Sequence, residues 1–141
     1  MRNIKSFFFL AAIFFSVFVV GCKDNIVSES DLQPPSGMNA TFSSIQKQLF
    51  NTSCATSGCH TGNNPQAGLN LSEGSAYNNL INVQSVLYPN LKRVTPGNKE
   101  ASLLFMVLSY NSETKMPPTG KLQQSLIDSV GAWIDKGAQN N

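Results

Sequence analysis

Two of the three cysteines and the only histidine of this 141-residue sequence lie within seven consecutive positions. Cys54 and Cys59 are separated by four residues, and His60 follows the second cysteine directly. Thiolates are nucleophiles and metal ligands, and imidazole is the commonest metal ligand among side chains. Such a group can form a disulfide, bind a metal ion or carry a covalently attached cofactor.

The adjacency of Cys59 and His60 favours the covalent attachment of haem. In that arrangement two thiols add to the vinyl groups of haem, and the histidine after the second cysteine reaches the iron. The usual motif has two residues between the cysteines, whereas residues 55–58 make four here. All four are small, and Gly58 can adopt backbone angles that other residues rarely adopt, so we expect a compact bulge.

Met116 is the predicted second ligand of the iron. The sequence has no other histidine, Met38 lies in a polar segment, and Met106 lies in an apolar helical pattern typical of core packing. Met116 stands in "TKMPPTG", where two prolines prevent helix formation and stiffen the loop. A thioether opposite a histidine raises the reduction potential of haem iron.

Two other interpretations of the cysteines are possible. A Cys54–Cys59 disulfide would belong to a non-haem binding or structural domain, but it closes a very short loop and does not explain His60. A zinc site would need a fourth ligand, or a water, besides Cys54, Cys59 and His60. A haem sensor or gas binder would require Met116 to be absent from the iron. No set of catalytic acid, base and nucleophile is visible, so we expect no enzyme.

The first 21 residues predict an export signal. Arg2 and Lys5 precede an apolar run, residues 7–20, that is too short to span a bilayer comfortably. A small residue stands directly before Cys22, which resembles a bacterial lipobox. We therefore predict lipidation of Cys22 and an exported, membrane-tethered protein on the periplasmic side, the outer membrane or the cell surface. An ordinary signal peptide or an uncleaved anchor is the alternative.

The mature chain has no surplus of positive charge. The sequence contains ten Lys and Arg and eight Asp and Glu, and removal of Arg2 and Lys5 with the signal leaves eight of each. A protein that grips nucleic acid needs clustered surplus cations, so nucleic acid is not an expected partner. Residues 22–40 are polar and contain two adjacent prolines, which predicts a flexible tether.

Residues 41–141 predict one all-α domain. Apolar side chains recur at helical spacing in four segments, residues 41–54, 71–81, 94–110 and 122–138. Thr41 or Ser43, Ser72 and Asn98 are the expected N-caps of the first three, and Gly137 is the expected stop of the last. The segment 81–91 favours a loop. Large apolar side chains are few for a domain of this size, so we expect a cofactor to fill the middle.

With these motifs in this order, the chain resembles the single-haem class I cytochrome c domains found in lipoproteins of planctomycete- and Bacteroidetes-like bacteria. The matching stretches are "IQKQLFNTSCATSGCHTG", "AGLNLSEGSAYNNLI", "VTPGNKEASLLFMVL", "KMPPTGKL" and "VGAWIDKGA". The resemblance implies a cytochrome c-like helical domain wrapped around one covalently bound haem c, which carries single electrons between redox partner proteins.

The resemblance also implies roles for individual residues. Cys54 and Cys59 would carry the haem, with His60 and Met116 as the iron ligands. Pro65 would lie near the proximal edge, Arg93 would pair with a haem propionate or remain solvated, and Phe50 would face Trp133 where the first and last helices cross.

Overall fold

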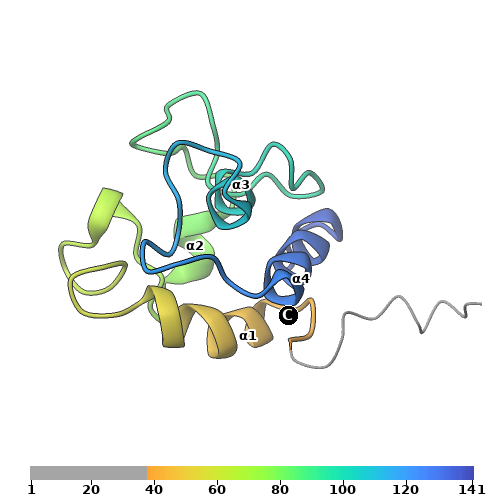
Figure 1. The fold of residues 1–141 in the computed structure, drawn as a ribbon, viewed down its shortest axis with the longest axis horizontal. Helices are drawn as coiled ribbons and strands as arrows, with labels where there is room; N and C mark the ends of the chain where they lie inside the picture. Colours follow the sequence, from red (N-terminus) through yellow and green to blue (C-terminus); the bar gives the residue numbers. More distant parts are fainter. Residues whose placement is uncertain (1–37) are drawn as a thin grey trace, which may run out of the picture. The chain divides into compact units, whose positions relative to one another are not determined.

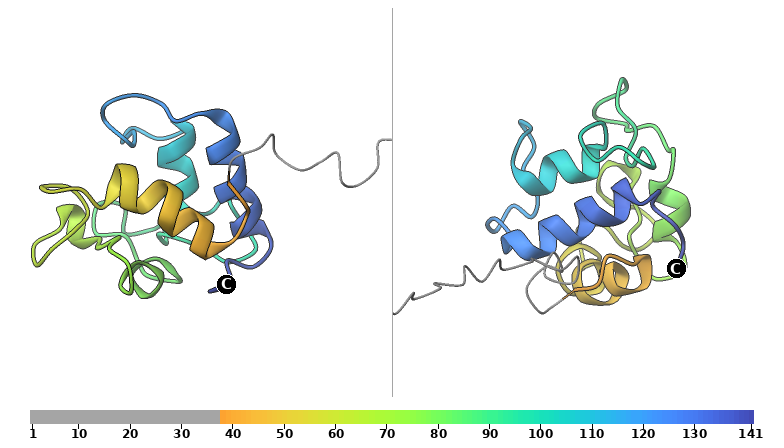
Figure 2. Two further views of the ribbon diagram at one scale, coloured as in Figure 1. Left: turned by 90° about the horizontal axis from the view of Figure 1, so that it is seen from below. Right: turned by 90° about the vertical axis from the view of Figure 1, so that its right-hand side faces the viewer.

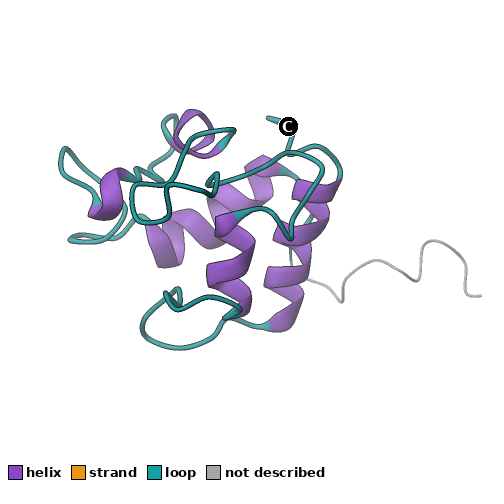
Figure 3. Ribbon diagram, turned by 90° about the horizontal axis from the view of Figure 1, so that it is seen from above, coloured by secondary structure: helices purple, strands orange, loops and turns teal. Residues whose placement is uncertain are grey.

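A computed structural model describes residues 38–141 of the chain. The predicted export signal, the predicted lipidation of Cys22 and most of the predicted tether lie outside the described residues. Within residues 38–141 the structure consists of helices joined by long loops, and no strand forms there (Figure 3). No helix in this part of the chain is long and apolar enough to cross a membrane.

The helices occupy the four segments in which apolar side chains recur. Helix α1 covers Phe42–Ile45 and continues as the π-helical segment η2 over Gln46–Cys54. A short 3₁₀ turn, η3, covers Gln66–Gly68. The remaining helices are α2 at Ala76–Leu80, α3 at Leu103–Ser109 and α4 at Gln124–Asp135 (Figure 1).

Helix α1 begins where the sequence predicts a cap. The side-chain oxygen of Thr41 accepts a hydrogen bond from the Ser44 amide at 3.3 Å, which satisfies one of the free N–H groups at the helix start. The helix then runs through η2 to Cys54, and the amide of Ala55 still bonds back to the Phe50 carbonyl at 2.7 Å. Cys54 is therefore the last residue of this helical segment, which buries Leu49 and Phe50 in the core.

Helix α4 lies between α1 and α3 and contacts both of them (Figure 2). Trp133 of α4 packs on Phe42 of α1, with ring centroids 5.6 Å apart, and Phe42 also meets Phe50 at 6.4 Å and Tyr77 at 5.1 Å. The ring that packs on Trp133 is thus that of Phe42, whereas the resemblance implies Phe50 as its partner. Helix α4 ends as predicted, because Gly137 adopts a φ of 96°, which closes the last turn.

The second and third helices start later than predicted. Gly74 adopts a φ of 79°, so residues 72–75 form turns and α2 begins only at Ala76, not after Ser72. Asn98 accepts a hydrogen bond from the Ala101 amide at 3.0 Å, but this closes a turn that precedes α3. The predicted loop at residues 81–91 is a loop in the structure, with isolated bridges at Ile81 and Gln84.

The domain begins earlier than the predicted boundary at residue 41. Met38, which the sequence analysis assigns to the tether, is buried with 5% exposure in the same core as α1 and α4. Its carbonyl accepts a hydrogen bond from the Ser129 hydroxyl at 2.8 Å, and Ser129 is itself buried on α4. A single apolar residue within a polar stretch has no periodicity, which is why its burial was not predicted.

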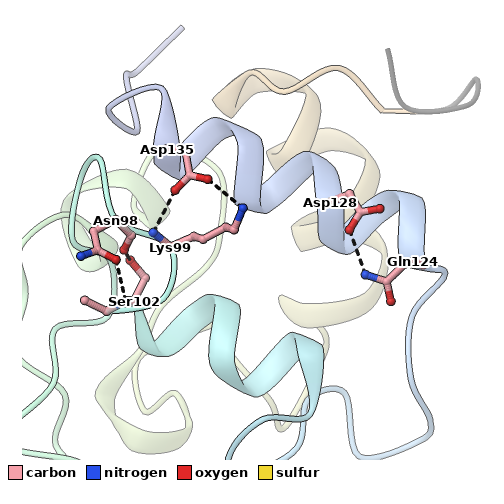
Figure 4. Close-up of polar contacts among 7 residues, drawn as sticks. Asn98, Lys99, Ser102, Gln124, Asp128 and Asp135 are labelled. Carbon is pink, nitrogen blue, oxygen red and sulfur yellow. Dashed lines mark hydrogen bonds and ion pairs between the residues drawn. The ribbon is translucent and has the colours of Figure 1, made fainter. Parts of the chain in front are cut away.

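An ion pair joins α4 to the loop that precedes α3. The ammonium nitrogen of Lys99 lies 2.9 Å from a carboxylate oxygen of Asp135, whose other oxygen accepts the Lys99 amide at 3.1 Å (Figure 4). Partial burial raises the pKa of Asp135, but the hydrogen bonds and charge of Lys99 outweigh it and hold the pKa below its usual value. Asp128 lies about two turns before Asp135 on α4, and its carboxylate bonds only to Gln124 of the same helix.

We expect Asp135→Asn to lower the free energy of unfolding by less than about 1 kcal/mol at pH 7, because exposed ion pairs contribute little. The Asp135→Ala variant also removes the acceptor of the Lys99 amide and should cost about 1–2 kcal/mol. Because the folded pKa of Asp135 is lowered, the wild-type advantage over Asp135→Asn exists above pH about 4 and is lost as the pH falls below it. Denaturant unfolding at pH 7 and pH 3 measures this, with Asp128→Asn as the control. A wild-type advantage over Asp135→Asn that grows toward pH 3 would contradict it.

Candidate functional site

The strongest candidate site is a cavity on which His60 and Met116 converge, although 56 residues separate them in the sequence. About 540 Å³ of empty space lies between its walls, a volume that includes the part open to solvent. We call it the His60–Met116 cavity. Its other lining residues are Ala67, Leu69, Leu80, Ser85, Leu87, Tyr88, Arg93, Leu103, Leu104, Val107 and Thr114.

The apolar walls of the cavity come from α2, from α3, from η3 with the loop that follows it, and from Leu87 in the loop at residues 81–91. Leu80 is fully buried at the end of α2, and Leu104 and Val107 lie one turn apart on α3. Leu103 and Leu104 occupy the first turn of α3, so the same helix presents apolar side chains to the core and to the cavity. A mostly apolar enclosure of this kind suits a hydrophobic ligand better than a charged metabolite.

A hydrogen bond within its own loop orients the imidazole of His60. Its Nδ1 atom lies 3.2 Å from the carbonyl oxygen of Leu69. A carbonyl can only accept, so Nδ1 carries the proton and Nε2 keeps a free lone pair. This is the arrangement by which proteins fix the tautomer and direction of a metal-binding histidine. The backbone supports it, because the Leu71 amide bonds to the His60 carbonyl at 2.8 Å.

Met116 reaches the cavity from the irregular loop between α3 and α4. Its amide donates to the Val107 carbonyl of α3 at 3.0 Å. The Tyr110 hydroxyl donates to the Pro117 carbonyl at 3.0 Å, one residue further along. These two hydrogen bonds hold the backbone on both sides of the thioether, as the two prolines alone would not. Met106, the other methionine in this region, lies on α3 and does not line the cavity.

Cys54 and Cys59 are free thiols, and neither is among the residues that line the His60–Met116 cavity. Cys54 is partly buried at the end of η2, and Cys59 is exposed in the loop that leads to His60. Burial, with a smaller contribution from Cys59, raises the pKa of the Cys54 thiol to about 12. The four residues between them form a turn in which Gly58 adopts a φ of 77°, as the predicted bulge requires. The Cys59 amide closes this turn on the Thr56 carbonyl at 3.0 Å.

Arg93 is a buried cation in the wall of the cavity. Its side chain is 8% exposed, so it does not remain solvated. The guanidinium donates to the carbonyls of Asn79, Ala67 and Gly68 at 2.9, 3.1 and 3.2 Å. Burial lowers its pKa, yet an arginine stays protonated at neutral pH. Its recorded partners are neutral, since the ion pair found among residues 38–141 is that of Lys99 and Asp135.

The geometry bears on the alternative interpretations. Cys54 and Cys59 are not joined by a disulfide in the structure. Among residues 38–141, no three His, Cys, Asp or Glu side chains gather as metal ligands do. Pro65 precedes η3 and is not among the residues that line the cavity.

Three lining residues with polar side chains are not predicted from the sequence, namely Ser85, Tyr88 and Thr114. Tyr88 and Thr114 meet through their hydroxyls at 2.8 Å and lie on loops 26 residues apart. A contact between two loops leaves no local pattern in a sequence, so only the structure could find it.

Comparison of the chain with models of protein families, with curated protein sequences and with solved structures finds no match. The function is therefore argued from the residues and the geometry of the His60–Met116 cavity.

We expect Arg93→Lys to lower the free energy of unfolding by about 1–3 kcal/mol. A single ammonium cannot reproduce the fork that reaches three carbonyls, and buried acceptors left without a donor are costly. The neighbouring variant Lys92→Gln is the matched control, because the Lys92 side chain is exposed and bonds only to the side chain of Asn82. This variant should change the free energy of unfolding by less than about 0.5 kcal/mol. Thermal unfolding measures both. Equal effects of the two variants would show that the buried guanidinium adds no stability.

Proposed function

We propose that this protein is a c-type cytochrome that carries single electrons through one covalently bound haem with His60 and Met116 as iron ligands. The observation that carries the proposal is the His60–Met116 cavity. The histidine that directly follows Cys59 and the predicted methionine line the same apolar space. The cytochrome c-like character of the helical fold is part of this proposal.

The residues present fit a haem group. The cavity offers an apolar enclosure, a histidine whose Nε2 is free and a thioether held by its backbone. The thiols of Cys54 and Cys59 lie at the two ends of the turn that leads to His60. The unpaired charge of Arg93 is complementary to the propionate carboxylates that a haem carries.

The chain would perform distinct tasks in this function. When bound, haem supplies a one-electron couple at its iron, and the protein supplies attachment, orientation and tuning. Cys54 and Cys59 would form thioethers, and the Leu69 carbonyl would direct the lone pair of His60. Met116 would stabilise the reduced state. The apolar side chains of α2 and α3 would keep water from the site. The sequence shows no set of catalytic acid, base and nucleophile, so we expect no turnover.

The proposed place of the protein is an exported electron-transfer chain. Redox partner proteins would donate and accept the electron, and the predicted lipid at Cys22 would keep the domain at the membrane. Mass analysis of the exported protein, and of a Cys22→Ala variant that should lose membrane association, tests the anchor separately from the haem.

We expect protein exported by a host with haem c maturation machinery to be coloured and to show a sharp α-band on reduction. Its intact mass should include one haem, and a denaturing gel should retain the haem stain, because thioethers survive denaturation. Cys59→Ala should weaken the covalent link, whereas His60→Ala should keep the link but change the axial ligation. A colourless protein whose mass is two hydrogens below that of the reduced chain would establish the Cys54–Cys59 disulfide instead.

We expect Met116→Ala to abolish the sulfur-to-iron charge-transfer band and to lower the midpoint potential by on the order of 100 mV. This is a small part of the roughly 0.8 V range that axial ligands set in haem proteins. Met106→Ala is the matched control, because Met106 is also partly buried but does not line the cavity. Absorption spectra and redox titration measure the change. A charge-transfer band that persists in Met116→Ala, or that disappears in Met106→Ala, would show that the ligand assignment is wrong.

A further inference from the structure

The segment that carries Met116 contains little that would hold it by apolar burial. Residues 110–121 contain no helix, and none of their side chains is fully buried in the structure. Met116 is only partly buried where it packs against the core, so hydrogen bonds contribute to holding the segment. A thioether on such a segment would leave and rejoin an iron more readily than one that is packed in a core.

Most hydrogen bonds of this segment are local. The amides of Asn111 and Met116 bond to carbonyls of α3, the helix that immediately precedes it. Tyr110 and Gly120 bond to the Pro117 carbonyl, within the segment itself. These contacts shape the loop and attach it to α3, but they do not connect it to the other segments that surround the cavity.

Tyr88 provides the connection to a remote part of the chain. Its hydroxyl oxygen lies 2.8 Å from the Thr114 side-chain oxygen and accepts the Thr114 amide at 3.3 Å. Thr114 stands two residues before Met116, and both Tyr88 and Thr114 line the His60–Met116 cavity. Among the hydrogen bonds recorded for residues 110–121, these two alone reach a segment outside the loop and α3.

The loop that carries Tyr88 is itself closed. The Ser85 amide bonds to the Leu91 carbonyl at 3.0 Å, and the Leu91 amide bonds to the Tyr88 carbonyl at 2.8 Å. The Tyr88 amide donates to the hydroxyl of Ser85, which is buried with 7% exposure. Tyr88 is thus fixed at its backbone before its hydroxyl reaches Thr114.

We propose that Tyr88 is a positioning residue for Met116, and that its hydroxyl keeps the thioether on the iron by tying Thr114 to the loop at residues 85–91. This inference rests on the proposed function. Without the tie, the Met116 segment would still be shaped by its local hydrogen bonds but would open more often. The binding of an external ligand that competes with Met116 depends directly on the fraction of open molecules.

The test is the binding of imidazole to the ferric protein, followed by the loss of the sulfur-to-iron charge-transfer band. Tyr88→Phe removes only the hydroxyl and should tighten the apparent Kd for imidazole about tenfold, the order expected for lost hydrogen bonds. Thr114→Val keeps the amide that donates to Tyr88 and should produce a smaller increase in affinity. The double variant should resemble Tyr88→Phe, since both changes remove the same interaction.

Tyr77→Phe is the matched control. Its hydroxyl also makes one hydrogen bond to a remote residue, the Ala138 carbonyl at 3.0 Å, but Tyr77 does not line the cavity. It should lower the melting temperature while leaving the Kd for imidazole within twofold of wild type. Equal imidazole affinities for Tyr88→Phe and Tyr77→Phe, or no change in Thr114→Val, would overturn the inference while haem content and the wild-type band remain normal. Wild-type protein without covalent haem would overturn the proposed function instead, before any titration.

Discussion

The hydrogen bond between Nδ1 of His60 and the Leu69 carbonyl is the interaction on which the site depends. It determines which nitrogen of the only histidine keeps a lone pair. It also joins the loop after Cys59 to Leu69, in the segment between η3 and α2. The loop between the two residues contains Gly62 and Gly68, both at positive φ, which lets the eight residues 61–68 fold back on themselves. A less compact loop would leave the imidazole free to rotate, and the cavity would lose its defined polar end.

The cavity is supported in two different ways. Its apolar walls belong to α2 and α3, which also contribute to the buried core, so the shape of the walls is as stable as the fold. The loops that form its rim are joined by hydrogen bonds from Arg93 and Tyr88. Breaking hydrogen bonds between loops requires less free energy than opening the core. We therefore propose that ligands exchange at the rim and that the walls exclude water.

The sequence predicts the helices well because each one buries an apolar stripe of recurring residues. Thr41 and Gly137 were identified correctly because a cap and a left-handed stop depend on one residue and its immediate neighbours. Starts of helices were less predictable, since Gly74 and Asn98 favour turns that compete with the first helical turn. His60 and Met116 line one cavity, and their pairing as iron ligands stays a prediction. The burial of Arg93 and the contact of Tyr88 with Thr114 depend on how loops meet, which no local pattern encodes.

The burial of Met38 has a mechanical consequence. If the chain is held at a membrane through its N-terminal part, as proposed, any pull enters the described domain at Met38 and passes to Ser129 and the paired helices α1 and α4. Neither Met38 nor Ser129 lines the cavity. Load from the membrane would therefore be borne by the helical core, and thermal movement of the anchored domain would reach the loops around the cavity only weakly.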